Sequence, residues 1–232
     1  LEPDDRLCFS FFHPSMQDEP LIFVVVALMD KIPESISEVL SQDREKVSKG
    51  NETTAVFYSI SNCQKGLKGI SFGNFLIKQV ANAIRTDYPN IKDFVTLSPV
   101  PGFMDWLELN NNELFKSIDN GQFINETDEY KDDILKNSLD YFFNSERSDK
   151  LPNDSVARFH LGNGAYLHRI NFLGDLSKKA LNSAAGLMVN YKYDLDKIEE
   201  NHEEFFKEKN IICSNEIQLM KKNYHKKKFK FG

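Results

Sequence analysis

The first half of the chain contains apolar runs of strand length, separated by polar turns. Residues 7–12 and 21–28 are aromatic and β-branched runs on either side of the loop HPSMQDEP, a pattern that predicts two antiparallel strands. Residues 55–61 (AVFYSIS) predict a third strand, and residues 94–97 predict a fourth that ends at Ser-Pro. The first half is therefore expected to contribute most of a sheet.

Helices are predicted where apolar residues recur at intervals of three and four. This spacing occurs at residues 36–47, 72–84 and 176–189. A Lys-rich segment at residues 219–231 is typical of a solvated helix, within a tail at 219–232. Alternation of strands with helices favours an α/β or α+β chain.

The middle of the chain differs in composition from the rest. Residues 104–153 are polar, rich in Asn, Asp and Glu, with scattered aromatic side chains, which predicts an insertion of short helices. After it, residues 157–172 are interpreted as one or two strands with a tight Gly-Asn-Gly turn.

Composition then narrows the class of protein. With 232 residues and 41% hydrophobic side chains, the chain is long enough for one sizeable core, and a single domain over residues 1–232 is expected. The 3 cysteines contain no CxxC pair, which predicts neither disulfides nor a zinc ribbon. The net charge of −6 argues against a nucleic-acid partner, and the longest apolar run, 21–28, is far shorter than the roughly 20 residues that span a membrane.

The glycine-containing loop at residues 66–74 (GLKGISFGN) is the candidate anion site. It follows a predicted strand and precedes a predicted helix, so backbone N–H groups and the helix dipole could face a phosphate. Gly69 and Gly73 would allow close backbone approach, and Lys65 and Lys68 would add positive charge. The loop is similar to the pyrophosphate loop of the GNAT-type N-acetyltransferase fold; the alternative is a plain turn with a packing contact.

Several longer segments resemble the malonyl-CoA decarboxylase family. They are FFHPS, DEPLIFV, FYSISNCQKGLKGISFGNFLIK, TLSPVPGF, ARFHLGNGAYLHRINFLGD and SAAGLMVNYKYDL, in the family's order. The resemblance implies a catalytic domain of GNAT-type fold, with a mixed central sheet flanked by helices and the polar helical insertion. It also implies that the family's N-terminal helical domain, used in oligomerisation, is absent from this chain.

The resemblance assigns roles to individual residues. The family's catalytic serine and histidine fall on Ser98 and His160, and the tyrosine near the acyl group falls on Tyr193. The loop that binds CoA falls on Lys68, Gly69, Ile70, Ser71, Phe72, Gly73 and Asn74. Some members have an acidic residue at the position of Ser71, so no role of that carboxylate is carried over.

The implied reaction is conversion of malonyl-CoA to acetyl-CoA and CO2. Loss of CO2 leaves a thioester enolate, which needs hydrogen-bond donors and a proton, and a histidine can exchange protons near neutral pH. Taken alone, His160 could be a core histidine, and Ser98 a turn serine before proline. His168, in an alternating apolar segment, is interpreted as a strand residue facing solvent or a neighbour. With no HExxH, no CxxC and no His/Asp cluster, neither metal nor cofactor is expected.

Two other functions stay open from the sequence. An acyl-CoA N-acyltransferase would use the same fold and loop, and a non-catalytic acyl-CoA-binding module would need only the loop. A homo-oligomer is implied by the resemblance, through the missing domain. The location is expected to be the cytoplasm by default, or the mitochondrion if an upstream transit peptide was lost; the C-terminus carries no Ser-Lys-Leu peroxisomal signal.

Overall fold

A mixed β-sheet forms the centre of the fold. The computed structural model describes residues 4–44, 46–64, 66, 75–119, 122–125, 127–145 and 147–228. Its strands are β1 (Arg6–His13), β2 (Met16–Met29), β3 (Thr54–Asn62), β4 (Asp93–Thr96), β5 (Ser98–Pro99), β6 (Tyr166–Asn171) and β7 (Met188–Tyr193). The order in the sheet is β1-β2-β3-β4-β7-β5, and β6 also pairs with β7. β3 and β4 run parallel, whereas the other pairs are antiparallel.

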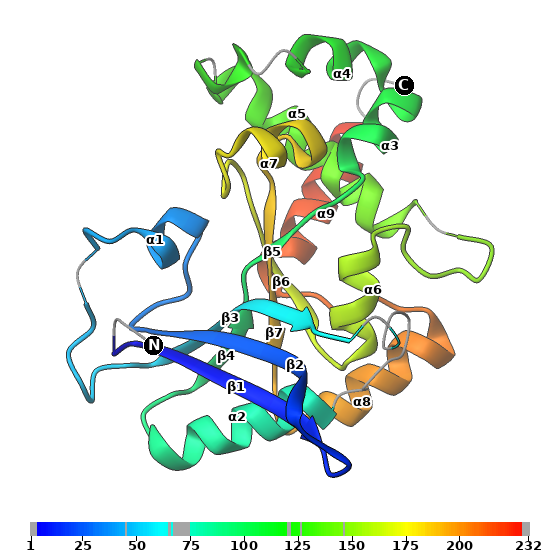
Figure 1. Cartoon of the computed structure of the whole chain (residues 1–232). Helices are drawn as coiled ribbons and strands as arrows, with labels where there is room; N and C mark the ends of the chain where they lie inside the picture. The colour runs from blue at the N-terminus through cyan, green and yellow to red at the C-terminus, as the bar shows by residue number, and fades with distance from the viewer. Residues whose placement is uncertain are drawn as a thin grey trace.

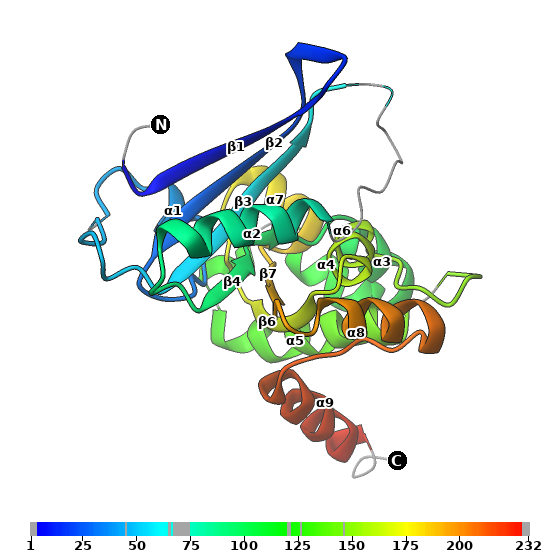
Figure 2. The same ribbon diagram turned by 90° about the horizontal axis from the view of Figure 1, so that it is seen from below.

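Helices surround this sheet, as Figures 1 and 2 show. They are α1 (Ile36–Leu40), α2 (Phe75–Asp87), α3 (Phe103–Asn110), α4 (Asn112–Ile118), α5 (Thr127–Phe143), α6 (Ser155–Gly162), α7 (Lys178–Ala184), α8 (Ile198–Glu203) and α9 (Asn215–Lys228). Two short helical turns are η2 (Gln122–Asn125) and η3 (Glu204–Glu208). In Figure 1, α2 lies beside the first strands, while α3, α4, α5 and α7 gather at the other end of the sheet. The predicted mixed α/β architecture is confirmed.

Side-chain alternation along the strands divides the core between the two faces of the sheet. Val24, Val26 and Leu28 of β2 are buried in the larger hydrophobic cluster, together with the apolar side of α2. Their neighbours Ala27 and Met29 belong to a smaller cluster on the other face, which the α1 segment covers. The larger cluster also contains the residues that surround the candidate site.

The four predicted strands of the first half are confirmed, but the predicted helix at residues 36–47 is wrong beyond Leu40. Ser41 has an extended backbone (ψ 134°), so the helix stops after five residues. The side chain of Leu40 is 56% exposed. Since this position has no core to pack against, helical spacing alone does not stabilise a longer helix.

The insertion is helical, as predicted, although α5 is a long helix of 17 residues rather than a short one. Residues 176–189 are only partly helical. The helix α7 ends before Ala185, which adopts a left-handed conformation (φ 50°), and Val189 already belongs to β7.

The interpretation of residues 157–172 as strands is wrong over its first part. Residues 155–162 form the helix α6, which begins where the carboxylate of Asp154 accepts a hydrogen bond from the Ala157 N–H at 2.6 Å. The Gly-Asn-Gly turn exists, but it joins a helix to β6. Gly164 has φ 84°, and a Cβ there would lie 2.3 Å from the carbonyl oxygen of Ile198, so the turn requires glycine.

Candidate active site

The candidate site lies where two parallel strands separate. The last residue pair of the β3–β4 ladder is Phe57 and Thr96, followed by a single hydrogen bond from the Leu97 N–H to the Phe57 carbonyl at 3.2 Å. Beyond this point β3 continues to Asn62, whereas β5 pairs with β7. Among the residues that the structure describes, one edge of the β3 backbone is therefore left without a neighbouring strand.

A groove of about 470 Å³ occupies the gap. It is lined by Phe57, Tyr58, Ser59, Ile60, Asn62, Leu97, Ser98, Pro99, Ser155, Val156, Phe159 and His160. These residues come from β3, from β5 with the residue before it, and from α6, whose ribbon stands beside the end of β3 in Figure 1. The described lining contains no Asp, Glu, Lys or Arg, and His160 is its one histidine.

Ser98 and His160 meet in this groove. Ser98 is the first residue of β5, and His160 lies on α6, 62 positions later. The serine Oγ lies 3.1 Å from the histidine Nε2, and each residue is 5% exposed. The pair predicted from the resemblance is therefore within hydrogen-bond distance and open to the groove.

Two tyrosines of β7 contact the imidazole of His160. The hydroxyl of Tyr193 lies 2.9 Å from His160 Nδ1. The ring of Tyr191 stacks on the imidazole with 4.8 Å between centroids and 25° between planes. The two tyrosines are buried and stand two positions apart on β7. Their side chains therefore point to the same face of the strand, against α6.

Burial dominates the electrostatics of the site. It lowers the pKa of His160 to about 3, because no described charged group offsets the loss of solvent around the imidazolium. Burial likewise raises the pKa of Tyr193 above its usual value. At neutral pH the histidine is thus a neutral imidazole between two neutral hydroxyl groups.

Two residues that the sequence analysis did not single out connect the elements that carry the pair. Tyr141 of α5 donates its hydroxyl to the Pro101 carbonyl at 2.9 Å, three residues after Ser98. The same hydroxyl lies 3.4 Å from the carboxylate of Asp154, which caps α6. Burial raises the pKa of Asp154 to about 6. These contacts link the end of β5 to the start of α6.

The other predicted site residues divide into two groups. Tyr193 contacts His160 directly, whereas Lys68, Gly69, Ile70, Ser71, Phe72, Gly73 and Asn74 lie outside the described residues. His168 lies on β6, where its ring centroid is 6.0 Å from that of Tyr166, and it is not among the residues that line the groove. Two contacts of the pair were missed: Tyr191 stacks on His160, and Thr96 Oγ1 lies 2.9 Å from Ser98 Oγ. Each stands two positions from a predicted site residue in an extended segment and therefore shares its face.

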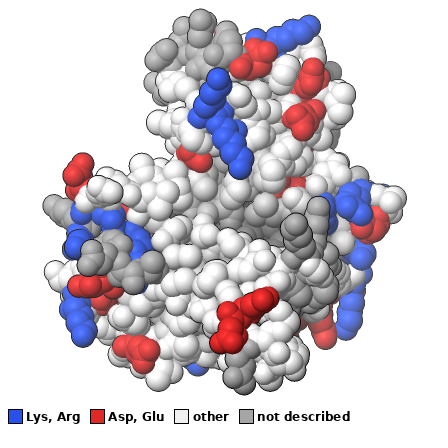
Figure 3. Space-filling model, viewed as in Figure 1, with Lys and Arg blue, Asp and Glu red and all other residues white. Residues whose placement is uncertain are grey.

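Two further properties bear on ligands and surroundings. Within the described ranges, no three His, Cys, Asp or Glu side chains converge as a metal site. In that same part of the chain, no helix combines the length and apolar character needed to cross a bilayer. In the view of Figure 3, the described surface between the upper helices and the lower strands is mostly uncharged, with basic side chains above it and acidic ones below it.

Comparison with known proteins gives consistent results. The profile of the malonyl-CoA decarboxylase C-terminal domain matches residues 1–230. A mitochondrial malonyl-CoA decarboxylase from Anser anser anser is 35% identical, over 91% of this chain and 49% of that protein. The crystal structure of a malonyl-CoA decarboxylase from Agrobacterium vitis is 46% identical with a TM-score of 0.88, over 95% of this chain and 58% of that one. The chain thus spans about half the length of the curated relative that it matches.

A more distant similarity concerns the fold alone. A GNAT-like decarboxylase, GphF, solved with isobutyryl-CoA, superposes with a TM-score of 0.52 at 15% identity, over 81% of this chain and 77% of that one. The GNAT-type fold implied by the resemblance is therefore confirmed.

Proposed function

Since this chain belongs to the malonyl-CoA decarboxylase family, we propose that it removes the free carboxylate of malonyl-CoA as CO2 and releases acetyl-CoA. The observation that carries the proposal is the hydrogen-bonded pair of Ser98 and His160, open to a groove between diverging strands. A protein that only binds acyl-CoA would need no such pair.

The reaction consists of two steps. The bond between the α-carbon and the carboxylate breaks, CO2 leaves, and the electron pair moves into the thioester as an enolate. Hydrogen-bond donors directed at the enolate oxygen each contribute roughly 3–4 kcal/mol in comparable sites. The α-carbon then takes a proton from the Ser98–His160 pair, and water restores that proton, so each turnover consumes one proton.

The surroundings of the pair favour the first step. A carboxylate among neutral groups loses much of its solvation, whereas the product CO2 is neutral and the enolate charge moves toward the donors. The described lining of the groove contains no Lys or Arg that would hold the carboxylate in its ground state. Loss of CO2 is thereby favoured over tight binding of the substrate.

The rest of the substrate is proposed to occupy the gap and the loop that follows β3. The unpaired edge of β3 after Phe57 offers backbone N–H and C=O groups to the amides of the pantetheine arm. Lys68, Gly69, Ile70, Ser71, Phe72, Gly73 and Asn74 remain the proposed pyrophosphate-binding loop, on the strength of the resemblance and of the following helix α2. For Tyr193, the hydrogen bond to Nδ1 supports a role in orienting His160 beside the acyl group.

The competing function is acyl transfer to an amine, which the same fold would permit. The test is incubation of the purified chain with malonyl-CoA and no acceptor, with acyl-CoA species separated by chromatography and CO2 measured independently. We expect equal amounts of acetyl-CoA and CO2. The yield of both products should be the same in buffer with and without a chelator. Turnover that needs an amine, or unchanged malonyl-CoA, would favour the transferase or the binding module.

Location and assembly belong to the same proposal. The relative from Anser anser anser carries the word mitochondrial in its name, which supports the mitochondrial alternative over the cytoplasmic one. We propose self-association through the family's additional helical domain, and light scattering of this chain alone, compared with a form that includes that domain, tests it.

A further inference from the structure

The antiparallel ladder that β4 and β5 form with β7 is interrupted at Thr96 and Leu97. Val95 pairs with Lys192, and Ser98 pairs with Val189, so the register is the same on both sides of the interruption. Thr96 therefore stands opposite Tyr191. In a regular ladder, the carbonyl of Thr96 would accept the Tyr191 N–H.

Here two side chains replace that backbone hydrogen bond. The Tyr191 N–H donates instead to the hydroxyl oxygen of Thr96 at 3.2 Å. The Thr96 carbonyl accepts from the side-chain amide of Asn190 at 2.9 Å. Both Thr96 and Asn190 are 0% exposed, so each of these buried polar groups obtains a partner.

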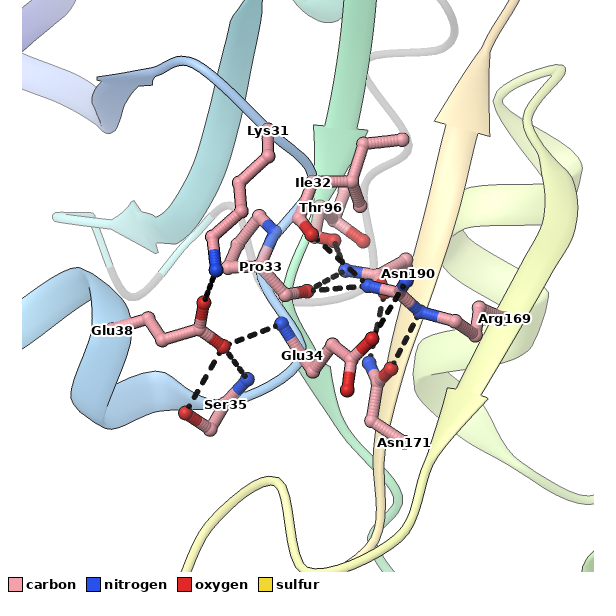
Figure 4. A network of polar contacts seen from close by, with 10 residues as sticks. All are labelled: Lys31, Ile32, Pro33, Glu34, Ser35, Glu38, Thr96, Arg169, Asn171 and Asn190. Atoms are coloured by element: carbon pink, nitrogen blue, oxygen red, sulfur yellow. Dashed lines mark hydrogen bonds and ion pairs between the residues drawn. The ribbon is translucent and has the colours of Figure 1, made fainter. Parts of the chain in front are cut away.

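The amide of Asn190 is itself fixed in orientation, as Figure 4 shows. Its Nδ2 also donates to the Pro33 carbonyl at 3.2 Å, and its Oδ1 accepts from Asn171 at 2.9 Å. The Oδ1 of Asn171 accepts in turn from Arg169 Nε at 2.8 Å. This network holds the Thr96 carbonyl, and the Thr96 hydroxyl oxygen lies between the Tyr191 N–H and Ser98 Oγ.

The direction of the next hydrogen bond follows from this geometry. The Ser98 hydroxyl donates to Thr96 Oγ1 at 2.9 Å. A serine has only one hydroxyl proton, so toward His160 Ser98 can only accept. The proton between them must therefore be on His160 Nε2. In a neutral imidazole Nδ1 is then unprotonated, and it accepts from the Tyr193 hydroxyl at 2.9 Å.

We propose that Thr96 is a positioning residue that sets the direction of this hydrogen-bond chain, from Tyr193 through His160 and Ser98, and so holds His160 as the Nε2–H tautomer. This role rests on the proposed function, because only a reaction in the groove makes use of a proton on Nε2. Thr96 itself does not line the groove, and its side chain reaches the pair through the hydroxyl of Ser98.

Two substitutions separate the hydroxyl from the shape of the side chain. Thr96→Val keeps a β-branched side chain but removes the acceptor, so the Ser98 hydroxyl is free to turn and donate to Nε2. We expect His160 to shift toward the Nδ1–H tautomer, and kcat to fall about 10-fold or more with KM within about twofold of the parent. Thr96→Ser keeps the hydroxyl, so the tautomer and kcat within about threefold should be retained.

The tautomer is read from the nitrogen chemical shifts of His160, assigned by the signal that disappears in His160→Asn. An Nδ1–H tautomer in the parent protein overturns the proposal. This measurement needs no Thr96 variant, so the proposal can be tested even if the variants do not fold. Parent kcat and an Nε2–H tautomer in folded Thr96→Val overturn it equally. If the parent makes no acetyl-CoA, the proposed function fails, whereas the tautomer measurement still decides the direction of the chain.

Discussion

Burial of a neutral histidine at the candidate site makes the stability of this protein depend on pH in a predictable direction. The pKa of His160 is 6.5 when solvated and about 3 when folded. Near pH 5 the unfolded chain binds a proton at this residue and the folded chain does not, so stability is lost as pH falls from 6.5 toward 3. Between about pH 8 and about pH 5 the loss integrates to about 2 kcal/mol.

His160→Asn removes this contribution, so relative to the parent it should gain about 2 kcal/mol of unfolding free energy over that pH change. Urea denaturation followed by the fluorescence of Trp106, the single tryptophan, measures the free energy at both pH values. Asp154 acts in the opposite direction, because its raised pKa means that the folded state gains stability as pH falls through about 6. This second contribution is present in both proteins and cancels in their difference.

An exposed histidine provides the matched control. His13 is the last residue of β1 and is exposed, so His13→Asn measures the effect of the same substitution outside the groove. If the difference between His160→Asn and the parent is the same near pH 5 and near pH 8, the imidazole titrates normally in the folded state. The account of a neutral, desolvated histidine would then be wrong.

Four further outcomes are expected. Ser98→Ala and His160→Asn should each lower kcat about 100-fold with little effect on malonyl-CoA affinity, and because both serve one step the double variant should lose far less than the product; additive losses would indicate independent roles. Gly69→Val should weaken binding of CoA itself by calorimetry, and unchanged affinity in a folded variant would remove the loop from the proposal. Turnover should survive EDTA; a loss restored by added metal would contradict the expectation of metal-free chemistry. Gly164→Ala should lower the free energy of unfolding by about 2–3 kcal/mol, measured by urea titration, because the residue has φ 84° and its Cβ would meet the Ile198 carbonyl at 2.3 Å.

Prediction of the elements succeeded where the local pattern and the final packing agree. The apolar runs of β2 and β3 are buried on both faces of the sheet, so their composition alone identifies them as strands. Prediction failed for α6, an eight-residue segment whose apolar content suits either a strand or a helix. The cap by Asp154 and the packing against β7 make this segment a helix, and its periodicity shows neither of them.

For the candidate site, the amino-acid sequence by itself determined the family and indicated Ser98, His160 and Tyr193 as candidate residues, because long motifs in a set order carry that information. It could not determine that the imidazole is neutral or which of its nitrogens carries the proton. Those properties depend on burial and on hydrogen-bond partners that lie 62 and 33 positions from His160 along the chain. Only the tertiary structure brings such distant groups within 3.1 Å, since a pKa and a tautomer are set by the atoms around a ring and not by its neighbours in sequence.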